Sequence, residues 1–267
     1  EHAIGACLDA LLSGGVQAEI VVVANGCTDQ TAAVARSRRG VSVIELTEGS
    51  KPKALNAGDR EATSFPRIYL DADIAVPHGC VGGLVAALSD TGAFAAVPRR
   101  AVATEGRPWL VRAYFRVNER LPAYQNGLFG RGMIALSERG RGRFGEFPLM
   151  VADDLFLDSL FASHEKVQVP DFTITVPTPT RTGELLRRLA RVRRGNAAMR
   201  RAGSKGEVIA VIRRADRWAW LRDVVARQPR LWPSGAAYFV ISVSASAAAR
   251  FKRPTSLEWG RSSSSHR

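Results

Sequence analysis

The sequence predicts an α/β fold in which a mostly parallel sheet is covered by helices on both faces. Short apolar, β-branched segments alternate with amphipathic helical segments over about the first hundred residues, which is the pattern of strands joined by helical crossovers. Polar motifs directly follow two of the apolar segments, and such sheets bind ligands at the carboxyl ends of their strands. The length of 267 residues is sufficient for one sizeable core.

The first part of the chain supplies most of the alternating elements. Apolar residues at helical spacing predict an opening helix from Ala3 to Leu12. The β-branched run Ile20 to Ala24 is typical of a strand buried on both faces, and Asn25-Gly26 ends it. The next elements follow in order: a helix from Thr28 or Asp29 to about Arg39, strand Val41 to Leu46, helix Lys53 to Thr63, strand Arg67 to Leu70, helix Val81 to Leu88 and strand Ala93 to Val97.

After about residue 100 the alternation becomes less regular. The expected elements are helix Trp109 to Leu121, a Gly-rich turn and strand over Leu128 to Leu136, a basic loop at Arg139 to Arg143, helix Val151 to Phe161, strand Val167 to Val176, and a basic amphipathic helix from Thr182 to about Arg201. We therefore divide the chain into an α/β domain over residues 1–180 and a basic, helical C-terminal extension over residues 181–267.

Positive charge dominates the composition, with 38 Lys and Arg against 25 Asp and Glu, a net charge of +13. This balance favours anionic partners such as nucleic acid, an acidic membrane surface or a phosphorylated substrate. We expect no nucleic acid, because the sequence has no nucleic-acid motif and no aromatic residues interleaved with the basic ones. The basic residues crowd together after Arg181: Arg187, Arg188, Arg191, Arg193, Arg194, Arg200 and Arg201.

The longest apolar run, Gly235 to Ala249, is shorter than the roughly 20 residues of a membrane-spanning helix. Beside the basic segment it leaves peripheral membrane association open. The three cysteines form no Cys-x-x-Cys pair, and the four histidines have no metal-ligand spacing. This composition argues against a disulfide framework or a zinc site and is typical of a reducing compartment. We expect a cytoplasmic protein, with a place at the inner face of the cell membrane as the more specific alternative.

Asp71 and Asp73 directly follow the apolar strand Ile68 to Leu70. Two carboxylates one residue apart at a strand end can hold Mg²⁺ or Mn²⁺, cations that prefer oxygen ligands and can keep substrate phosphates in the same shell. An Asp-x-Asp is common by chance, so this pair alone would be a weak indication.

The Asp71 and Asp73 pair belongs to a series of four motifs that follow one another along the chain. They are Val21-Val-Val-Ala-Asn-Gly-Cys-Thr-Asp-Gln-Thr31, Ser50-Lys-Pro-Lys-Ala-Leu-Asn-Ala-Gly58, Tyr69-Leu-Asp-Ala-Asp73 and Ala152-Asp-Asp-Leu155. This series resembles glycosyltransferase family 2, whose members have the GT-A fold. The family's usual forms are a valine-rich strand ending in Asp-Asn-Gly-Ser-Thr-Asp-x-Thr, then Gly-Lys-x-x-Ala-Leu-Asn-x-Gly, then Asp-x-Asp, then Glu-Asp or Asp-Asp opening a helix. The resemblance covers roughly residues 1–196.

The resemblance implies a binding site for a nucleoside-diphosphate sugar. Asn25 matches the contact to the nucleotide base, and Lys51 matches a lysine beside the nucleotide; a solvated helix start is the alternative for Lys51. Asp71 would approach the ribose and Asp73 would hold the metal, with Asp71 beside it. Glu1 matches the last residue of a Pro-x-x-Asn-Glu motif that lines the nucleotide pocket.

The resemblance also implies the catalytic group. Asp154, the second residue of the pair with Asp153, matches the family's general base, which takes a proton from the acceptor hydroxyl. Asp153 is expected among the residues that bind the nucleotide sugar. Taken alone, the pair would be better explained as a favourable charge pair at a helix N-terminus. Arg194 falls where many relatives carry a Gln-x-x-Arg-Trp signature that holds the diphosphate, although Arg191 replaces its Gln and Gly195 its Trp. Arg194 would contact the phosphate, and a solvated basic helix is the alternative.

Two departures from the family pattern bear on activity. Ala24 stands where an acidic residue usually precedes Asn-Gly, so base recognition must differ or rely on Asn25. The sequence opens at Glu1, where relatives have already completed a first strand, so we expect a missing strand between Ile20 to Ala24 and Ile68 to Leu70. Unpaired strand edges are costly.

We therefore expect an inverting, metal-assisted glycosyltransferase that moves a sugar from a nucleoside-diphosphate sugar to a hydroxyl of a glycan or lipid-linked acceptor, in synthesis of the cell envelope, a polysaccharide or a glycolipid. The alternative is a truncated, non-catalytic remnant of the same fold that binds a nucleotide or a partner.

Overall fold

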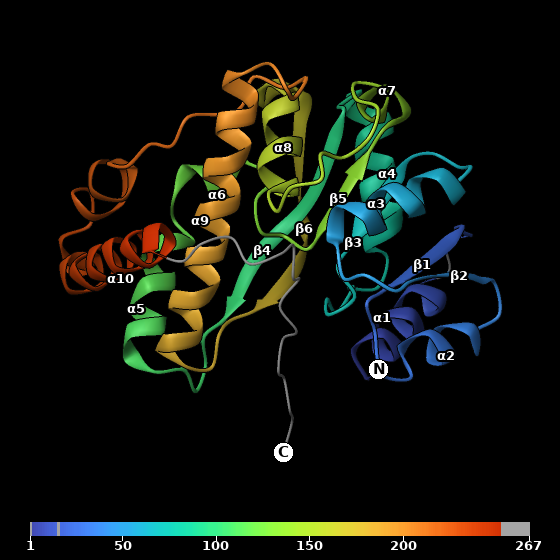
Figure 1. Cartoon of the computed structure of the whole chain (residues 1–267), viewed down its shortest axis with the longest axis horizontal. Coiled ribbons are helices and arrows are strands. Elements are labelled where there is room, and N and C mark those ends of the chain that lie inside the picture. The colour runs from blue at the N-terminus through green and yellow to red at the C-terminus, as the bar shows by residue number, and fades with distance from the viewer. Residues whose placement is uncertain (1, 15–16, 252–267) are drawn as a thin grey trace.

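The structure is a computed structural model that describes residues 2–14 and 17–251 (Figure 1). Glu1, which the sequence places in the nucleotide pocket, lies outside the described residues. The elements of the first part are α1 (His2–Ser13), β1 (Ile20–Asn25), α2 (Thr31–Arg36), β2 (Val41–Leu46), α3 (Lys51–Glu61), β3 (Arg67–Leu70), α4 (Cys80–Thr91) and β4 (Ala95–Ala103). Helix α2 is shorter than predicted, and its start is held by Asp29, whose Oδ1 accepts the N–H and hydroxyl of Thr31.

The remaining elements are α5 (Trp109–Asn118), α6 (Pro122–Asn126), β5 (Met133–Leu136), α7 (Glu138–Arg141), α8 (Asp153–Leu160), η1 (Ser163–Glu165), β6 (Lys166–Pro177), α9 (Thr182–Ser204), η2 (Trp220–Val225), η3 (Pro229–Leu231) and α10 (Trp232–Phe251). The prediction of a basic loop at Arg139 to Arg143 was wrong, because most of that segment is the short helix α7. The Ser137 hydroxyl accepts the N–H of Gly140 and caps this helix.

The strands form two sheets among the described residues. β1 and β2 pair in parallel, and a four-stranded sheet has the order β3-β5-β4-β6. In the larger sheet β5 is antiparallel to both β3 and β4, while β6 is parallel to β4, so β3, β4 and β6 share one direction. This is the predicted α/β class with mostly parallel strands. β1 and β3 are not paired with each other in this arrangement; the expected strand between them stays a prediction.

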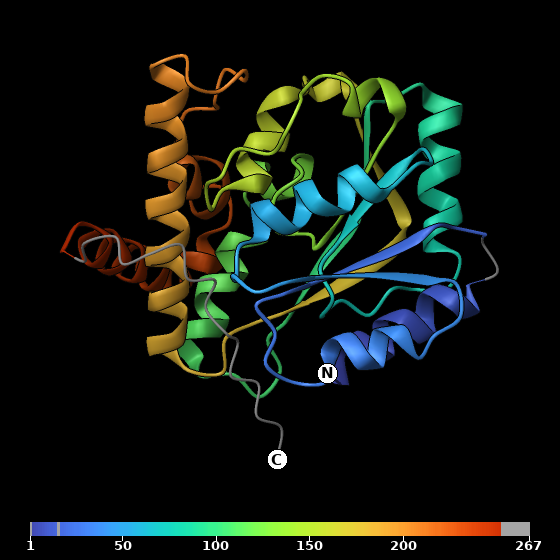
Figure 2. The same ribbon diagram turned by 45° about the vertical axis from the view of Figure 1, so that its right-hand side comes forward.

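Helices cover both faces of the β1–β2 pair (Figure 2). Ile20 and Val22 pack with Ile4 and Leu8 of α1 and with residues of α2. Val23 points to the other face, where its side chain lies 3.4 Å from the position that a Cβ on Gly58 of α3 would take. The β-branched run is therefore covered on both faces, as its lack of polar alternation predicts.

The four-stranded sheet separates two apolar clusters by simple alternation of its residues. Leu70 and Met133 face the cluster that includes α4, whereas Tyr69 and Ile134 face the cluster that includes α8. Successive strand residues point to opposite faces, so both faces of this sheet are covered. Met199 of α9 lies in the same cluster as α8, which joins the start of the basic extension to the α/β core.

Helix α10 lies with α5 on the side of the molecule away from β1 and β2 (Figure 1). The Tyr238 ring of α10 stacks on Tyr114 of α5 with centroids 4.9 Å apart. The outward face of α10 stays apolar: Phe239, Val240 and Val243 are each about half exposed. Within residues 2–14 and 17–251, no helix is both long enough and apolar enough to cross a membrane.

Candidate functional site

The loops that follow β1 and β2 meet at the start of α3. The Ser50 N–H donates to Oδ1 of Asn25 over 2.7 Å, so the last residue of β1 fixes the residue before the helix. Gly26 has a φ of +65°, and a Cβ there would lie 2.7 Å from the backbone nitrogen of Gly49. Only glycine allows this approach, which explains the Asn-Gly of the first motif.

Lys51, the first residue of α3, joins carboxylates from two other elements. Its Nζ lies 2.9 Å from Oδ1 of Asp71 and 2.8 Å from Oδ2 of Asp153. A cation at a helix N-terminus opposes the helix dipole, so this position is explained by its partners and not by the helix. Burial would lower the Lys51 pKa, but Asp153, Asp71 and Asp154 outweigh it and hold that pKa well above its usual value. Lys51 therefore stays charged.

The Asp71-Ala-Asp73 motif leaves β3 in a tight turn. The Asp71 N–H donates to the Gly132 carbonyl over 2.8 Å, and the Ile74 N–H donates to the Asp71 carbonyl over 3.1 Å. Asp73 is exposed in this turn. Neighbouring atoms still displace part of the water around its carboxylate; this partial desolvation and the charge of Asp71 raise the Asp73 pKa, whereas Arg188 and Lys51 lower it.

The Asp-x-Asp pair could supply two carboxylate ligands to a cation, but not a complete set of protein ligands. Among the described residues no three His, Cys, Asp or Glu side chains gather as a metal-binding group. Mg²⁺ commonly takes one or two carboxylates and completes its shell with water and substrate phosphates. The carboxylates of Asp71 and Asp73, close enough for one to raise the pKa of the other, fit that kind of site and not an all-protein cage.

Asp153 and Asp154 open α8, where two negative charges suit the helix N-terminus. Oδ2 of Asp154 accepts the N–H of Gly130 over 2.8 Å. Burial first, and then the charge of Asp153, raise the Asp154 pKa to about 7, although Lys51 and the Gly130 N–H favour the charged form. A carboxyl that titrates near neutral pH is suited to accept a proton.

Helix α9 passes close to the segment that leads into α8. A Cβ on Gly195 would lie 1.7 Å from the carbonyl oxygen of Val151, so a side chain there would force the two segments apart. Arg194, the predicted phosphate contact, precedes this glycine. The Arg191 pKa is lowered first by burial, then by the charge of Arg188, and then by the charge of Arg194, which therefore lies nearby. The replacement of the family's Trp by Gly195 therefore has a packing reason.

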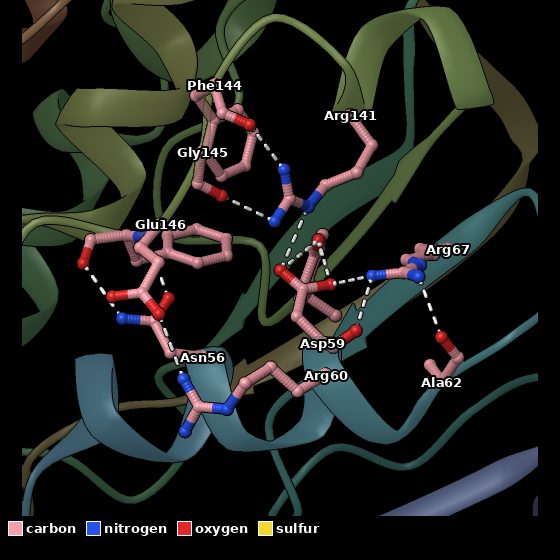
Figure 3. A network of polar contacts seen from close by, with 11 residues as sticks. Asn56, Asp59, Arg60, Ala62, Arg67, Arg141, Phe144, Gly145 and Glu146 are labelled. Atoms are coloured by element: carbon pink, nitrogen blue, oxygen red, sulfur yellow. Dashed lines mark hydrogen bonds and ion pairs between the residues drawn. The ribbon is translucent and has the colours of Figure 1, made fainter.

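A network around Asp59 anchors the other end of α3 (Figure 3). The Asp59 carboxylate, only 5% exposed, accepts Arg67 over 2.7 Å and Arg141 over 2.9 Å. It also accepts the Tyr69 hydroxyl over 2.9 Å. Asn56, from the Ala-Leu-Asn of the second motif, exchanges side-chain hydrogen bonds with the Phe147 backbone N–H and carbonyl. These contacts fix the helix that carries Lys51, and they give Asn56 a structural role.

The structure brings Lys51, Asp71, Asp153 and Asp154 into one cluster, with Asp73 beside it. Asn25 connects to this cluster through Ser50, whereas Arg194 forms no hydrogen bond or ion pair within the described part of the chain. Sequence reasoning missed two residues near the cluster: Gly130, whose N–H donates to Asp154, and Arg188, whose charge lowers the Asp73 pKa.

Comparison with known proteins gives a family and a fold. The profile of "Glycosyl transferase family 2" matches residues 1–144, more than half of the 267 residues. The chain belongs to this family. Asp153, Asp154 and Arg194 lie beyond the matched range. Curated protein sequences contain no significant match.

Among solved structures, S. aureus TarS 1–349 in complex with UDP-GlcNAc superposes with a TM-score of 0.51 at 16% identity. That comparison covers 67% of this chain and 56% of TarS 1–349. The same protein in complex with UDP gives a TM-score of 0.50 at 13% identity, over 92% of this chain and 87% of that one. The fold is therefore GT-A-like, as the sequence motifs imply.

Proposed function

We propose that the protein transfers a sugar from a nucleoside-diphosphate sugar to a hydroxyl acceptor with inversion at the anomeric carbon. The observation that carries this is the carboxylate cluster around Lys51: Asp71 and Asp153 both pair with this one cation, while burial and the charge of Asp153 raise the pKa of Asp154 beside them to about 7. Family membership supports the reaction class.

The donor is a uridine nucleotide in this proposal, since the similar TarS structures hold UDP and UDP-GlcNAc. Asn25 and Lys51 would contact the nucleotide, and Asp71 the ribose. Asp73, with Asp71 beside it, would hold Mg²⁺ or Mn²⁺; when bound, that ion neutralises charge on the diphosphate leaving group. Arg194 would contact the diphosphate.

Asp154 acts as the general base. Its ionised carboxylate takes the proton of the acceptor hydroxyl while that oxygen attacks the anomeric carbon from the side opposite the diphosphate. A single displacement of this kind inverts the configuration. Lys51 supports the reaction by compensating the charges of Asp71 and Asp153, which would otherwise raise the Asp154 pKa further.

The acceptor is a glycan or lipid-linked molecule of the cell envelope, and the protein works at the inner face of the membrane. The support is the apolar outward face of α10, where Phe239, Val240 and Val243 are half exposed. Arg230 and Arg250 flank the uncharged part of this helix. An apolar face with basic flanks is suited to an anionic membrane surface.

Calorimetric titration with UDP tests the donor site. We expect UDP to bind in the presence of Mg²⁺ or Mn²⁺, and Asp73→Ala to remove the metal-dependent part of the affinity without lowering the melting temperature. Asp90→Ala, at an equally exposed aspartate on α4, is the matched control and should bind UDP like the wild type. Equal, metal-independent affinity in the wild type and Asp73→Ala would contradict the metal site.

A further inference from the structure

Arg100 of β4 has more hydrogen-bonding capacity than its neighbours satisfy. Its Nε is buried and has no acceptor within the described residues. Its two terminal nitrogens reach only Oδ1 of Asn118, both at 3.4 Å, near the limit for a hydrogen bond. The guanidinium stacks on the Tyr124 ring, 4.7 Å from its centroid. A buried N–H without an acceptor costs roughly 1–3 kcal/mol, so this side chain is prepared for a further acceptor.

Arg100 lies next to the proposed general base. The Gly130 N–H donates to Asp154 over 2.8 Å, and a Cβ on Gly130 would lie 3.7 Å from Nε of Arg100 and 3.5 Å from the Tyr124 ring. One residue therefore separates the base from the unsatisfied guanidinium. Gly130 lies between Asp154 and Arg100, whereas Lys51 lies between Asp154 and Asp71. Arg100 and Asp71 are therefore next to the base through different residues.

A second arginine adds charge at the same place. Burial mainly lowers the Arg100 pKa, and the charge of Arg188 on α9 lowers it further, against Tyr124. Arg188 is exposed, and it donates a hydrogen bond to the carbonyl of Pro177 over 3.3 Å. Neither arginine forms an ion pair with a described acidic residue. The charges of Asp73 and Glu119 act on them from beyond ion-pair distance, and two guanidinium groups close to each other attract an anion.

We propose that Arg100 and Arg188 form an acceptor subsite that binds an oxyanion, a phosphate or a carboxylate, close to the hydroxyl that receives the sugar. The inference rests on the proposed glycosyl transfer and defines its acceptor class. The donor diphosphate is assigned to Arg194 and to the metal that Asp73 and Asp71 would hold, so an anion at Arg100, beside the proposed base, belongs to the other reactant. Arginine suits this task, because its planar fork can donate two parallel hydrogen bonds to one oxyanion.

The test uses the full chain saturated with UDP and Mg²⁺, so that the donor phosphate site is filled. Glycerol 3-phosphate, glycerate and glycerol are titrated as probes that share a hydroxyl but differ in charge. We expect the two anions to bind and glycerol to show no saturable binding. Preference for glycerol 3-phosphate over glycerate identifies a phosphate subsite, and the reverse order a carboxylate subsite.

Variants assign the binding to this subsite. Arg100→Gln should weaken glycerol 3-phosphate by roughly 10- to 100-fold, the usual worth of hydrogen bonds to a charged group, and Arg100→Lys should weaken it less. Arg188→Gln, at an exposed position that packing does not require, should also weaken it. Arg99→Gln is the matched control, because Arg99 is the exposed neighbour on β4 whose side chain points to the other face.

Two results would overturn the inference: no binding of either anion to the UDP-loaded protein, or equal affinity in Arg100→Gln, Arg188→Gln and Arg99→Gln. The UDP titration tests the donor site separately from the acceptor subsite. If UDP itself fails to bind, the proposed donor site is wrong. If UDP binds and glycerol 3-phosphate does not, the acceptor subsite alone is wrong.

Discussion

Lys51→Met should destabilise the protein by about 3 kcal/mol at pH 8. Lys51 and Asp153 are only 21% and 17% exposed at their side chains, and removal of one partner of a buried pair costs ~3–5 kcal/mol. The contact to Asp71, which is 42% exposed, is worth only ~0–1 kcal/mol. Removal of a cation from the helix N-terminus returns ~0.3–1 kcal/mol. The net loss is measurable against a typical domain stability of ~5–15 kcal/mol.

The loss should also depend on pH. The Lys51 charge lowers the Asp154 pKa, so without Lys51 the folded-state pKa of Asp154 rises further, and an acid whose pKa is raised by folding costs stability as pH increases through it. We therefore expect the deficit to be smaller at pH 5 than at pH 8 by at least ~1 kcal/mol, about one unit of pKa.

Urea unfolding at both pH values measures this difference. Lys53→Met is the matched control, because Lys53 lies on the same helix and pairs with Glu48 at the surface, where the two side chains are 42% and 58% exposed. Such a pair contributes at most ~1 kcal/mol. An equal loss in Lys51→Met and Lys53→Met, or a Lys51→Met deficit that is the same at both pH values, would refute the role of Lys51 as the counter-ion of the cluster.

Three further predictions concern the proposed base and the approach of α9 to the segment before α8. Asp154→Asn should keep UDP binding and lower sugar transfer at least ~100-fold, the worth of a positioned general base. Wild-type kcat/KM should rise with pH through about 7, since burial and Asp153 raise the Asp154 pKa to that value and the base acts when ionised. Gly195→Ala should cost about 3 kcal/mol, because its Cβ would lie 1.7 Å from the Val151 carbonyl oxygen.

Each of these has its own control. A loss of transfer in Asp153→Asn with none in Asp154→Asn would reverse the assignment of the base, and a rate that is flat from pH 5 to 8 would contradict the raised pKa. Gly183→Ala, on the same helix, places its Cβ 3.8 Å from Arg187, an ordinary contact, and should be neutral or stabilising by about 0.5 kcal/mol. If Gly195→Ala is as stable as Gly183→Ala, the close approach of α9 to Val151 is not a constraint.

The sequence predicted the bounds of strands best where the residue type changes clearly at the end of the strand. Strand β2 has the predicted bounds, Val41 to Leu46, and β3 has the predicted bounds, Arg67 to Leu70, because each is a short, mostly apolar segment followed by polar residues. Helix α7 was missed because its sequence is rich in Gly and Arg, and its start depends on the Ser137 cap. Local propensity alone did not indicate that cap.

The sequence predicted some residues of the candidate site and not others. Lys51, Asp71 and Asp154 stand in motifs, so their approach could be expected from the order of strands and helices. Gly130 could not be identified in this way, since its N–H meets Asp154 from 24 positions away along the chain. Arg100 likewise depends on tertiary packing, because only the folded chain places it beside the loop at Gly130.

The most direct test of the account follows the hydrolysis of UDP-GlcNAc by proton NMR, with Mg²⁺ and without added acceptor, so that water takes the place of the acceptor hydroxyl. We expect UDP and the β-anomer of the free sugar to appear first, before mutarotation, and Asp154→Asn to release UDP at least ~100-fold more slowly. Initial release of the α-anomer would contradict inversion. No UDP release by the wild type, or equal release by Asp154→Asn, would contradict the central claim that this carboxylate cluster catalyses glycosyl transfer.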